Sequence, residues 1–133
     1  MTVCPCGSGT PFATCCEPWL DGGAAPTAEA LMRSRYTAYT LLQRGDARAE
    51  TYLARTWHPR TRPRAIESSP GLTWTGLTIH EVSGGESDAD TGMVAFTARW
   101  TSGEGSARQR GELSERSRFA RRAGRWVYVD AET

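Results

Sequence analysis

The fold is decided by the stretch Thr91-Gly92-Met93-Val94-Ala95-Phe96-Thr97-Ala98-Arg99-Trp100, in which apolar and polar side chains alternate. Successive side chains of a β-strand point to opposite faces, so this period of two predicts a strand with one apolar face. That face carries Val94, Phe96, Ala98 and Trp100. A half-buried strand needs hydrogen-bonded neighbours, and the flanking sequence supplies them.

Three other segments show the same period of two. They cover residues 72–82, 108–121 and 125–130. The apolar parity of the first segment changes at Gly76, which predicts a β-bulge there. In the second segment Glu115 shares the inward face with Phe119, while Ser114 faces outward. Glycine-rich turns separate the segments, so the second half of the chain predicts an antiparallel sheet of about four strands.

Helical periodicity precedes the strands. Thr27 is a good N-cap for a helix over residues 28–44, and Gly45 ends it. Asp46 caps a second helix, which stops before Pro59 because a residue that precedes proline avoids the helical region. Residues 60–71 are rich in Pro, Arg and Ser and predict an extended loop.

Arg35 breaks the amphipathic pattern of the first helix. It lies on the stripe that also carries Leu31, Tyr39 and Leu42, which we expect to face the core. The opposite stripe, expected to face solvent, carries Arg33, Thr37, Thr40 and Arg44. A buried guanidinium needs a partner that compensates its charge, because an unpaired buried charge costs several kcal/mol and arginine keeps its proton.

Helices followed by long antiparallel strands define an α+β domain, with a curved sheet folded over its helices. This order resembles the nuclear transport factor 2-like cone, a fold that often encloses a pocket between helices and sheet. The fold hosts enzymes, ligand carriers and assembly modules, so it implies little about activity.

All four cysteines lie in the first sixteen residues, as Cys4-Pro5-Cys6 and Cys15-Cys16. Pairs this close make poor mutual disulfides, because the required Cα and Cβ geometry strains so short a loop. Four thiolates joined by a turn instead match the tetrahedral ligand set of one structural Zn²⁺ ion. A cluster of free thiols or a redox pair is the alternative interpretation.

The segment Cys4-Pro5-Cys6-Gly7-Ser8-Gly9, followed by Cys15-Cys16, resembles a SEC-C motif, the zinc knuckle named for the C-terminus of the translocase motor SecA. The last ligand of that motif is commonly His, and here Cys16 stands in its place. The lysines of the translocase motif are also missing between the ligand pairs, so its ribosome and chaperone contacts are not carried over.

Four further segments complete a resemblance to the YchJ-like family, bacterial proteins with a SEC-C knuckle and a nuclear transport factor 2-like body. They are Leu31-Met32-Arg33-Ser34-Arg35-Tyr36-Thr37-Ala38-Tyr39, Thr56-Trp57-His58-Pro59-Arg60-Thr61-Arg62-Pro63, Glu115-Arg116-Ser117-Arg118-Phe119 and Gly124-Arg125-Trp126-Val127-Tyr128-Val129-Asp130. The resemblance implies a knuckle over residues 1–22 and a body over residues 27–133. It brings no activity with it. The family's usual His before the Glu-Arg-Ser-Arg-Phe run is Ser114 here.

Length and composition exclude several classes of protein. The chain of 133 residues and 14.5 kDa is the size of one ordinary domain. No apolar run exceeds four residues, so we expect no membrane span. The first residues show neither a basic patch nor an apolar stretch, so we expect no signal peptide and a cytoplasmic location.

Arg35, His58 and Glu115 are polar residues on or near faces that we expect to be buried. The first interpretation is structural: an Arg35–Glu115 ion pair locks helix to sheet, with His58 bonded at a helix end. The alternatives are a small-ligand pocket and an active site, in which the Glu115 carboxylate beside His58 serves as general base and Arg35 holds an anionic substrate.

The charge distribution raises the question of partners. The net charge is +1 and all 16 basic residues are arginine. Arg108, Arg110, Arg116 and Arg118 share strand parity. Such a stripe suits nucleic-acid phosphates, although a solvated sheet face is the commoner explanation.

The knuckle itself suggests a protein-binding adaptor with an unidentified protein partner, and we expect binding rather than catalysis. Its loop carries Phe12, Pro18 and Trp19, apolar groups that so short a segment cannot bury alone. The first 32 residues hold no arginine and three acids, which with a zinc thiolate cluster sum to about −5. We therefore expect the knuckle to dock on an arginine-lined part of its own body, with Trp19 as its anchor.

Overall fold

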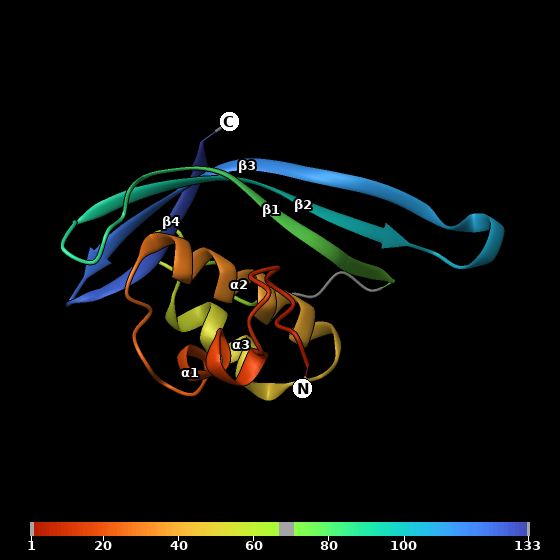
Figure 1. Cartoon of the computed structure of the whole chain (residues 1–133), viewed down its shortest axis with the longest axis horizontal. Coiled ribbons are helices and arrows are strands. Elements are labelled where there is room, and N and C mark those ends of the chain that lie inside the picture. The colour runs from red at the N-terminus through yellow and green to blue at the C-terminus, as the bar shows by residue number, and fades with distance from the viewer. Residues whose placement is uncertain (1, 67–70, 133) are drawn as a thin grey trace.

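The computed structural model describes residues 2–66 and 71–132 and has the predicted α+β architecture. Its four strands are β1 (Leu72–Gly84), β2 (Thr91–Ser102), β3 (Gln109–Arg122) and β4 (Arg125–Glu132). They form one antiparallel sheet in the order β1-β2-β3-β4. Figure 1 shows that this sheet arches over the helices, which lie together against its concave side.

The strand that decides the fold occupies the interior of the sheet, since β2 pairs with β1 on one edge and with β3 on the other. The predicted bulge is confirmed, because the register of β1 against β2 shifts between Trp74 and Gly76. A second shift, between Ile79 and Glu81, was not predicted. Both irregularities increase local twist and so help to curve the sheet over the helices.

Two helices fill the concave face, and their starts follow the predicted caps. Helix α2 (Ala28–Gln43) begins after Thr27, whose side chain accepts a hydrogen bond of 3.0 Å from the backbone N–H of Ala30. Helix α3 (Ala47–Arg55) begins after Asp46, which accepts one of 2.9 Å from Arg48 N–H. Gly45 joins them with a φ of 81°, a conformation that favours glycine.

The segment after α3 runs beside β4. The backbone N–H of His58 donates to the Tyr128 carbonyl at 2.8 Å, and Tyr128 N–H donates to the Thr56 carbonyl at 2.7 Å. This bridge holds Trp57 next to Tyr128. Beyond it the described residues up to 66 form turns and loop, as predicted, while residues 67–70 of the expected loop lie outside the described residues.

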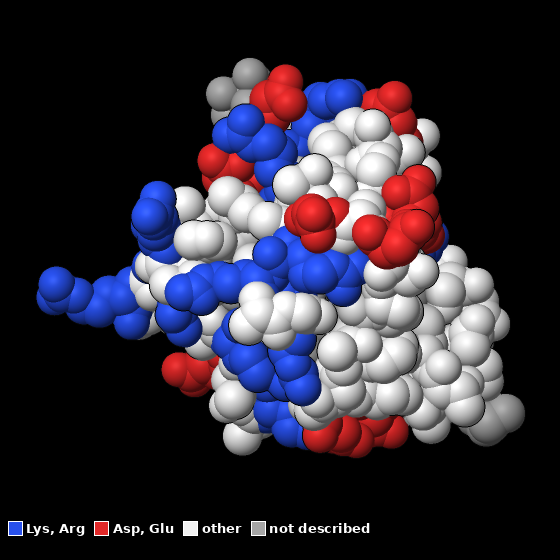
Figure 2. Space-filling model, turned by 90° about the vertical axis from the view of Figure 1, so that its left-hand side faces the viewer, with Lys and Arg blue, Asp and Glu red and all other residues white. Residues whose placement is uncertain are grey.

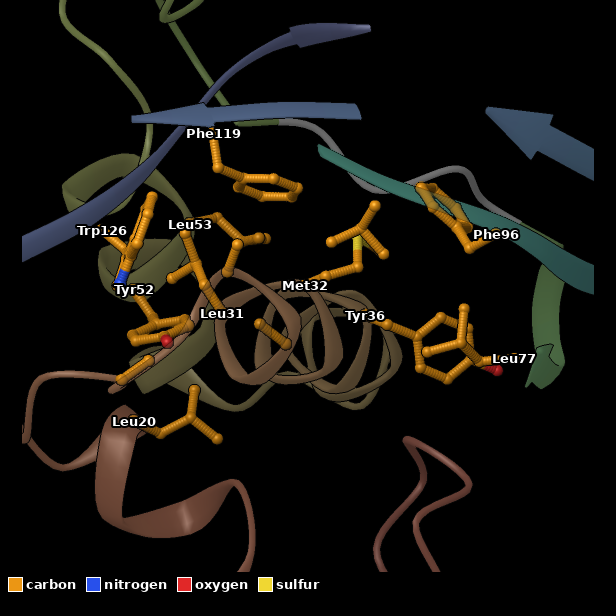
Figure 3. Packing of buried hydrophobic residues seen from close by; sticks show 14 of the residues in the cluster. Leu20, Leu31, Met32, Tyr36, Tyr52, Leu53, Leu77, Phe96, Phe119 and Trp126 are labelled. Carbon is orange, nitrogen blue, oxygen red and sulfur yellow. The ribbon is translucent and has the colours of Figure 1, made fainter. Parts of the chain in front are cut away.

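The core lies between α2, α3 and the sheet. Figure 3 shows Phe96 and Phe119 pointing from the strands towards α2, while Leu20 of helix α1 (Glu17–Leu20) approaches the helices from the opposite side. The N-terminal segment thus forms a third layer under the helices.

This third layer corrects the prediction for α2. Thr37 is fully buried and Thr40 is 7% exposed, although both were expected to face solvent. Arg33 and Arg44 remain at least partly exposed. The pattern misled because threonine is common on solvated faces, whereas Thr37 is covered by the knuckle through its contacts with Cys4 and Cys16.

Candidate metal centre and cavity

The four cysteines come together in one cluster. All four sulfurs lie within 4.8 Å of one another, and no cysteine forms a disulfide. Cys6 Sγ lies 3.6 Å from Cys15 Sγ, and Cys15 Sγ lies 3.9 Å from Cys16 Sγ. Four sulfurs around one ion at Zn–S distances of about 2.3 Å would be about 3.8 Å apart, so the donor set fits a tetrahedral ion. The cluster could therefore hold a metal ion.

Backbone turns and short hydrogen bonds build this cluster. The backbone N–H of Cys4 donates to the Thr10 carbonyl at 2.9 Å, which closes the first loop. Gly7 in that loop has a φ of 80°, which a side chain would strain. Ser8 Oγ lies 3.1 Å from Cys15 Sγ on the exposed side of the cluster. Three of the four cysteines are buried, and Cys15 is half-buried.

Helix α2 also contacts the sulfurs. The Thr37 hydroxyl donates to Cys16 Sγ at 3.4 Å and lies 3.6 Å from Cys4 Sγ. Hydrogen bonds to metal ligands orient them and tune the ion. The sequence did not indicate this role, because Thr37 is 21 residues beyond the last cysteine and was assigned to the solvated stripe.

The thiols perturb one another strongly. Hydrogen bonds from Cys16 and then Cys4 lower the pKa of Cys6, while hydrogen bonds to Cys4 and Cys6 raise the pKa of Cys16. Burial raises the pKa of Cys15. A cation bound among the four sulfurs would replace their protons.

The knuckle docks on an arginine-lined part of its own body, as expected. Arg33 Nη1 donates to the Cys6 carbonyl at 2.8 Å, and Arg55 Nη2 donates to the Trp19 carbonyl at 3.0 Å. Arg48 binds Glu17 at 3.0 Å and Asp21 at 2.8 Å. The most buried apolar anchor is Leu20, which is 6% exposed, and not the predicted Trp19. Trp19 is only half-buried, although it does pack against the core.

A cavity of about 260 Å³ lies between α2 and the sheet, on the other side of α2 from the knuckle. Its wall is mostly apolar and aromatic. Its polar or amphipathic members include Arg35 and Tyr39 of α2, Trp57, Glu115 of β3 and Tyr128 of β4. Two of the three predicted pocket residues, Arg35 and Glu115, therefore share one cavity.

Arg35 is buried but does not pair with Glu115, so the predicted ion pair is wrong. Its Nη1 atom donates to the Leu53 carbonyl at 3.0 Å and to Thr56 Oγ1 at 2.7 Å. No carboxylate among residues 2–66 and 71–132 lies within 4.0 Å of the guanidinium. Its positive charge instead faces the last turn of α3, where unpaired carbonyls carry partial negative charge.

Two aromatic rings enclose the same guanidinium. Arg35 Cζ lies 4.9 Å from the ring centre of Trp57 and 4.9 Å from that of Tyr128, which are cation–π distances. Burial nevertheless lowers the pKa of Arg35. Trp57 was not among the residues predicted to line the pocket. Its nearness to Arg35 depends on the bridge to β4, which no local pattern encodes.

His58 does not line the cavity, which corrects the third predicted pocket residue. Its Nδ1 accepts a hydrogen bond of 3.1 Å from the backbone N–H of Arg60, so the ring caps the turn after α3. The structural interpretation of His58, as a residue bonded at a helix end, is the one that the contacts support.

The predicted arginine stripe is partly neutralised within the chain. Arg116 pairs with Glu81 at 3.0 Å, and Arg118 pairs with Asp130 at 2.6 Å. Figure 2 shows basic side chains gathered in a band at one end of the molecule, between groups of acidic ones. Nucleic-acid binding stays a prediction that these pairs do not favour.

None of the helices in the described part of the chain combines the length and the apolar character that a membrane crossing requires.

Fold and cysteine cluster together define a class of protein, a SEC-C knuckle followed by a nuclear transport factor 2-like domain. Family models agree: residues 3–18 match the SEC-C motif, and residues 27–131 match the model described as "YchJ, middle NTF2-like domain". The chain belongs to this YchJ-like family.

Relatives and solved structures support the assignment. A UPF0225 protein of Streptomyces coelicolor is 48% identical over 97% of this chain and 94% of its own, and one of Deinococcus radiodurans is 47% identical over 96% and 87%. The solution structure of a SEC-C motif containing protein from Rhodopseudomonas palustris matches with a TM-score of 0.80 at 30% identity, covering 99% of this chain and 98% of the other.

Proposed function

We propose that the chain is a zinc-binding protein in which the ion is structural and the nuclear transport factor 2-like domain binds a small molecule. The observation that supports the ion is the cluster of four sulfurs within 4.8 Å of one another. Four thiolates complete the tetrahedral coordination of Zn²⁺ and leave no position for water. The ion would therefore stabilise the fold of the knuckle and take no part in a reaction.

Metal analysis of the purified chain tests this proposal. We expect one zinc per chain, and we expect Cys6→Ser to lose it because Cys6 is the most buried ligand. Ser114→Ala, on the outer face of β3, is the control that should keep the full zinc content. A Cys15–Cys16 disulfide in freshly reduced protein, or zinc retained by Cys6→Ser, would contradict the proposal.

The cavity supports small-molecule binding over the predicted adaptor role. Phe12 and Trp19, whose apolar surface suggested a partner, pack against the core of the chain itself. The large apolar side chains exposed in the described part of the chain are Val3, Val82 and Leu113, on three different elements. A cavity with an apolar wall and a few convergent polar groups is the usual form of a small-ligand site. A protein partner stays a prediction.

Toluene is a suitable neutral probe of the cavity, since dry apolar cavities take up small aromatic molecules. Nuclear magnetic resonance should show shifts of the Met32, Ala98 and Leu113 methyl groups, which line the cavity. Ala98→Leu should abolish them by filling the space. Ala131→Leu, outside the cavity in β4, should leave them unchanged. Toluene shifts unaffected by Ala98→Leu would overturn the proposal, and so would the absence of binding by both toluene and a polar single-ring probe.

A further inference from the structure

Two opposite charges line the cavity without meeting. Arg35 lies on α2 and Glu115 on β3, both in the cavity wall. Their charged atoms are more than 4.0 Å apart, because the pair is absent from the ion pairs formed by the described residues. In a mostly apolar cavity, two opposite charges that do not pair with each other both remain available to a ligand.

The guanidinium has donors to spare. Both of its hydrogen bonds within 3.5 Å to the described residues use Nη1, and the Tyr39 side chain is a further, more distant partner, so not all of its five N–H groups are used. Trp57 and Tyr128 face it at equal distances, so the rings fix its orientation. A fixed guanidinium with free N–H groups is suited to bind a carboxylate by two parallel hydrogen bonds.

A second unfilled donor lies beside the first. The indole N–H of Trp57 is buried and has no acceptor among the described residues. Trp57 lines the same cavity and packs on Arg35. A buried N–H without an acceptor is uncommon and often marks a group that a ligand or ordered water satisfies.

Glu115 provides a hydrogen-bond acceptor on the other wall of the cavity. Its nearest hydrogen bond comes from Ser117 Oγ, at a weak 3.4 Å, and leaves acceptor positions free. Its charge contributes to raising the pKa of both Tyr39 and Tyr128, after the larger effect of burial, so it acts on this cavity. The carboxylate would accept a hydrogen bond from a ligand hydroxyl or amine.

We infer that the cavity binds a small carboxylic acid with a single-ring apolar body and a hydrogen-bond donor remote from the acid group. Arg35 and the Trp57 N–H bind the carboxylate, and Glu115 binds the donor. A volume of about 260 Å³ is below the range of drug-sized pockets, which limits the body to one ring. The inference rests on the proposed small-molecule function and specifies its ligand class.

Titration of the zinc-loaded full chain with 4-hydroxyphenylacetate tests the inference. Two matched probes remove one group each: 4-hydroxyphenylacetamide lacks the charge, and phenylacetate lacks the remote hydroxyl. We expect the acid to bind at least about tenfold more tightly than the amide, because hydrogen bonds to charged groups are the stronger ones. Phenylacetate should bind several-fold more weakly than the hydroxy acid.

Variants assign each end of the ligand. Glu115→Gln should reduce the advantage of 4-hydroxyphenylacetate over phenylacetate, because a neutral amide oxygen accepts more weakly than a carboxylate. Trp57→Phe should weaken binding of the acid more than binding of the amide, because hydrogen bonds to charged groups are the stronger ones. Arg35→Gln should remove the preference for the acid; if it fails to fold, the Trp57 variant still tests that end. Ser114→Ala, next to Glu115 but on the outer face, is the matched control.

The possible outcomes distinguish failure of this inference from failure of the proposed small-molecule function. An amide that binds as tightly as the acid overturns the inference while toluene binding still supports the cavity as a site. An acid preference that survives in folded Arg35→Gln also overturns it. If neither toluene nor the acid binds, the proposed small-molecule function fails together with the inference.

Discussion

Thr37 connects helix α2 to the metal centre through its hydroxyl. Valine has the same shape without the hydrogen-bond donor, so Thr37→Val removes only the contacts to Cys16 and Cys4. Groups that bond to metal ligands typically change affinity by about 10–100-fold. We expect Thr37→Val to release zinc roughly tenfold faster to a chromophoric chelator at neutral pH.

Thr40→Val is the matched control for this measurement. Thr40 is buried on the same face of α2, but its hydroxyl donates to the Thr37 carbonyl at 2.7 Å and contacts no sulfur in the described residues. Both variants therefore bury a similar side chain, and only one touches the thiolates. Equal rates of zinc release from the two would show that helix packing, not the hydroxyl, retains the ion.

Arg35 and Glu115 should contribute unequally to stability. Arg35→Met leaves the buried Leu53 carbonyl without its side-chain donor and removes both ring contacts, so we expect a loss of about 1–3 kcal/mol. Glu115→Gln strands no partner, and we expect a loss under about 1 kcal/mol. Urea unfolding measures both. Similar losses, with strong non-additivity in the double variant, would restore the rejected ion pair.

The sequence predicted the burial of Arg35 and the inward face of Glu115, but not their partners. Strand parity and helix periodicity determine the side of an element on which a residue lies. They do not determine the distance across a cavity. The competing partners of Arg35 are Trp57 and Tyr128, 22 and 93 residues further along the chain, and only the bridge between the segment after α3 and β4 brings them together.

Between elements, Arg48 joins the knuckle to α3. It binds Glu17 and Asp21 of the N-terminal layer as well as Asp46, the N-cap of its own helix. Partly exposed pairs are individually weak, but a network that shares one cation adds up. We expect Arg48→Ala to lower the free energy of unfolding by about 1 kcal/mol at neutral pH.

This contribution should fade in acid. The hydrogen bond from Arg48 lowers the pKa of Asp46 below its usual value of 3.8. A lowered folded pKa stabilises the protein above the usual value and ceases to do so as the pH falls through the lower one. The stability difference between the chain and Arg48→Ala should therefore shrink below about pH 4. Arg44→Ala, an exposed arginine on the preceding turn, is the control and should show no such difference at either pH.

Most regular elements could be predicted because each is determined by a local pattern. The caps at Thr27 and Asp46, the bulge at Gly76 and the four strands were all confirmed. The short helix α1 was missed, since four residues carry too little periodicity and the docked layer determines its shape. The hidden face of α2 was misassigned for the same reason, because tertiary cover overrides the amphipathic pattern.

In the whole molecule, α2 separates two candidate sites. Its one side carries Thr37 at the cysteine cluster, and its other side carries Arg35 at the cavity. Figure 1 shows helix α1 and the sheet on different sides of this helix. Loss of the knuckle would therefore expose one side of α2 to water while the sheet kept its own hydrogen bonds.

Removal of the metal should therefore destabilise the knuckle and the side of α2 that it contacts, and not the sheet. Because metal binding is coupled to folding where the ligands lie, a chelator should unfold residues 1–22. It should also increase hydrogen exchange along α2, which the knuckle contacts at Thr37. Residues of β2 and β3 should stay protected, since they pair with strands on both sides. Hydrogen exchange with and without chelator, read by mass spectrometry, measures all three regions at once.

Cys6→Ser should reproduce the chelated pattern without added chelator. Unchanged exchange in α2 would mean that the knuckle stays docked without its metal. Equal loss of protection in the sheet would mean that the ion stabilises the whole fold rather than the layer that it staples.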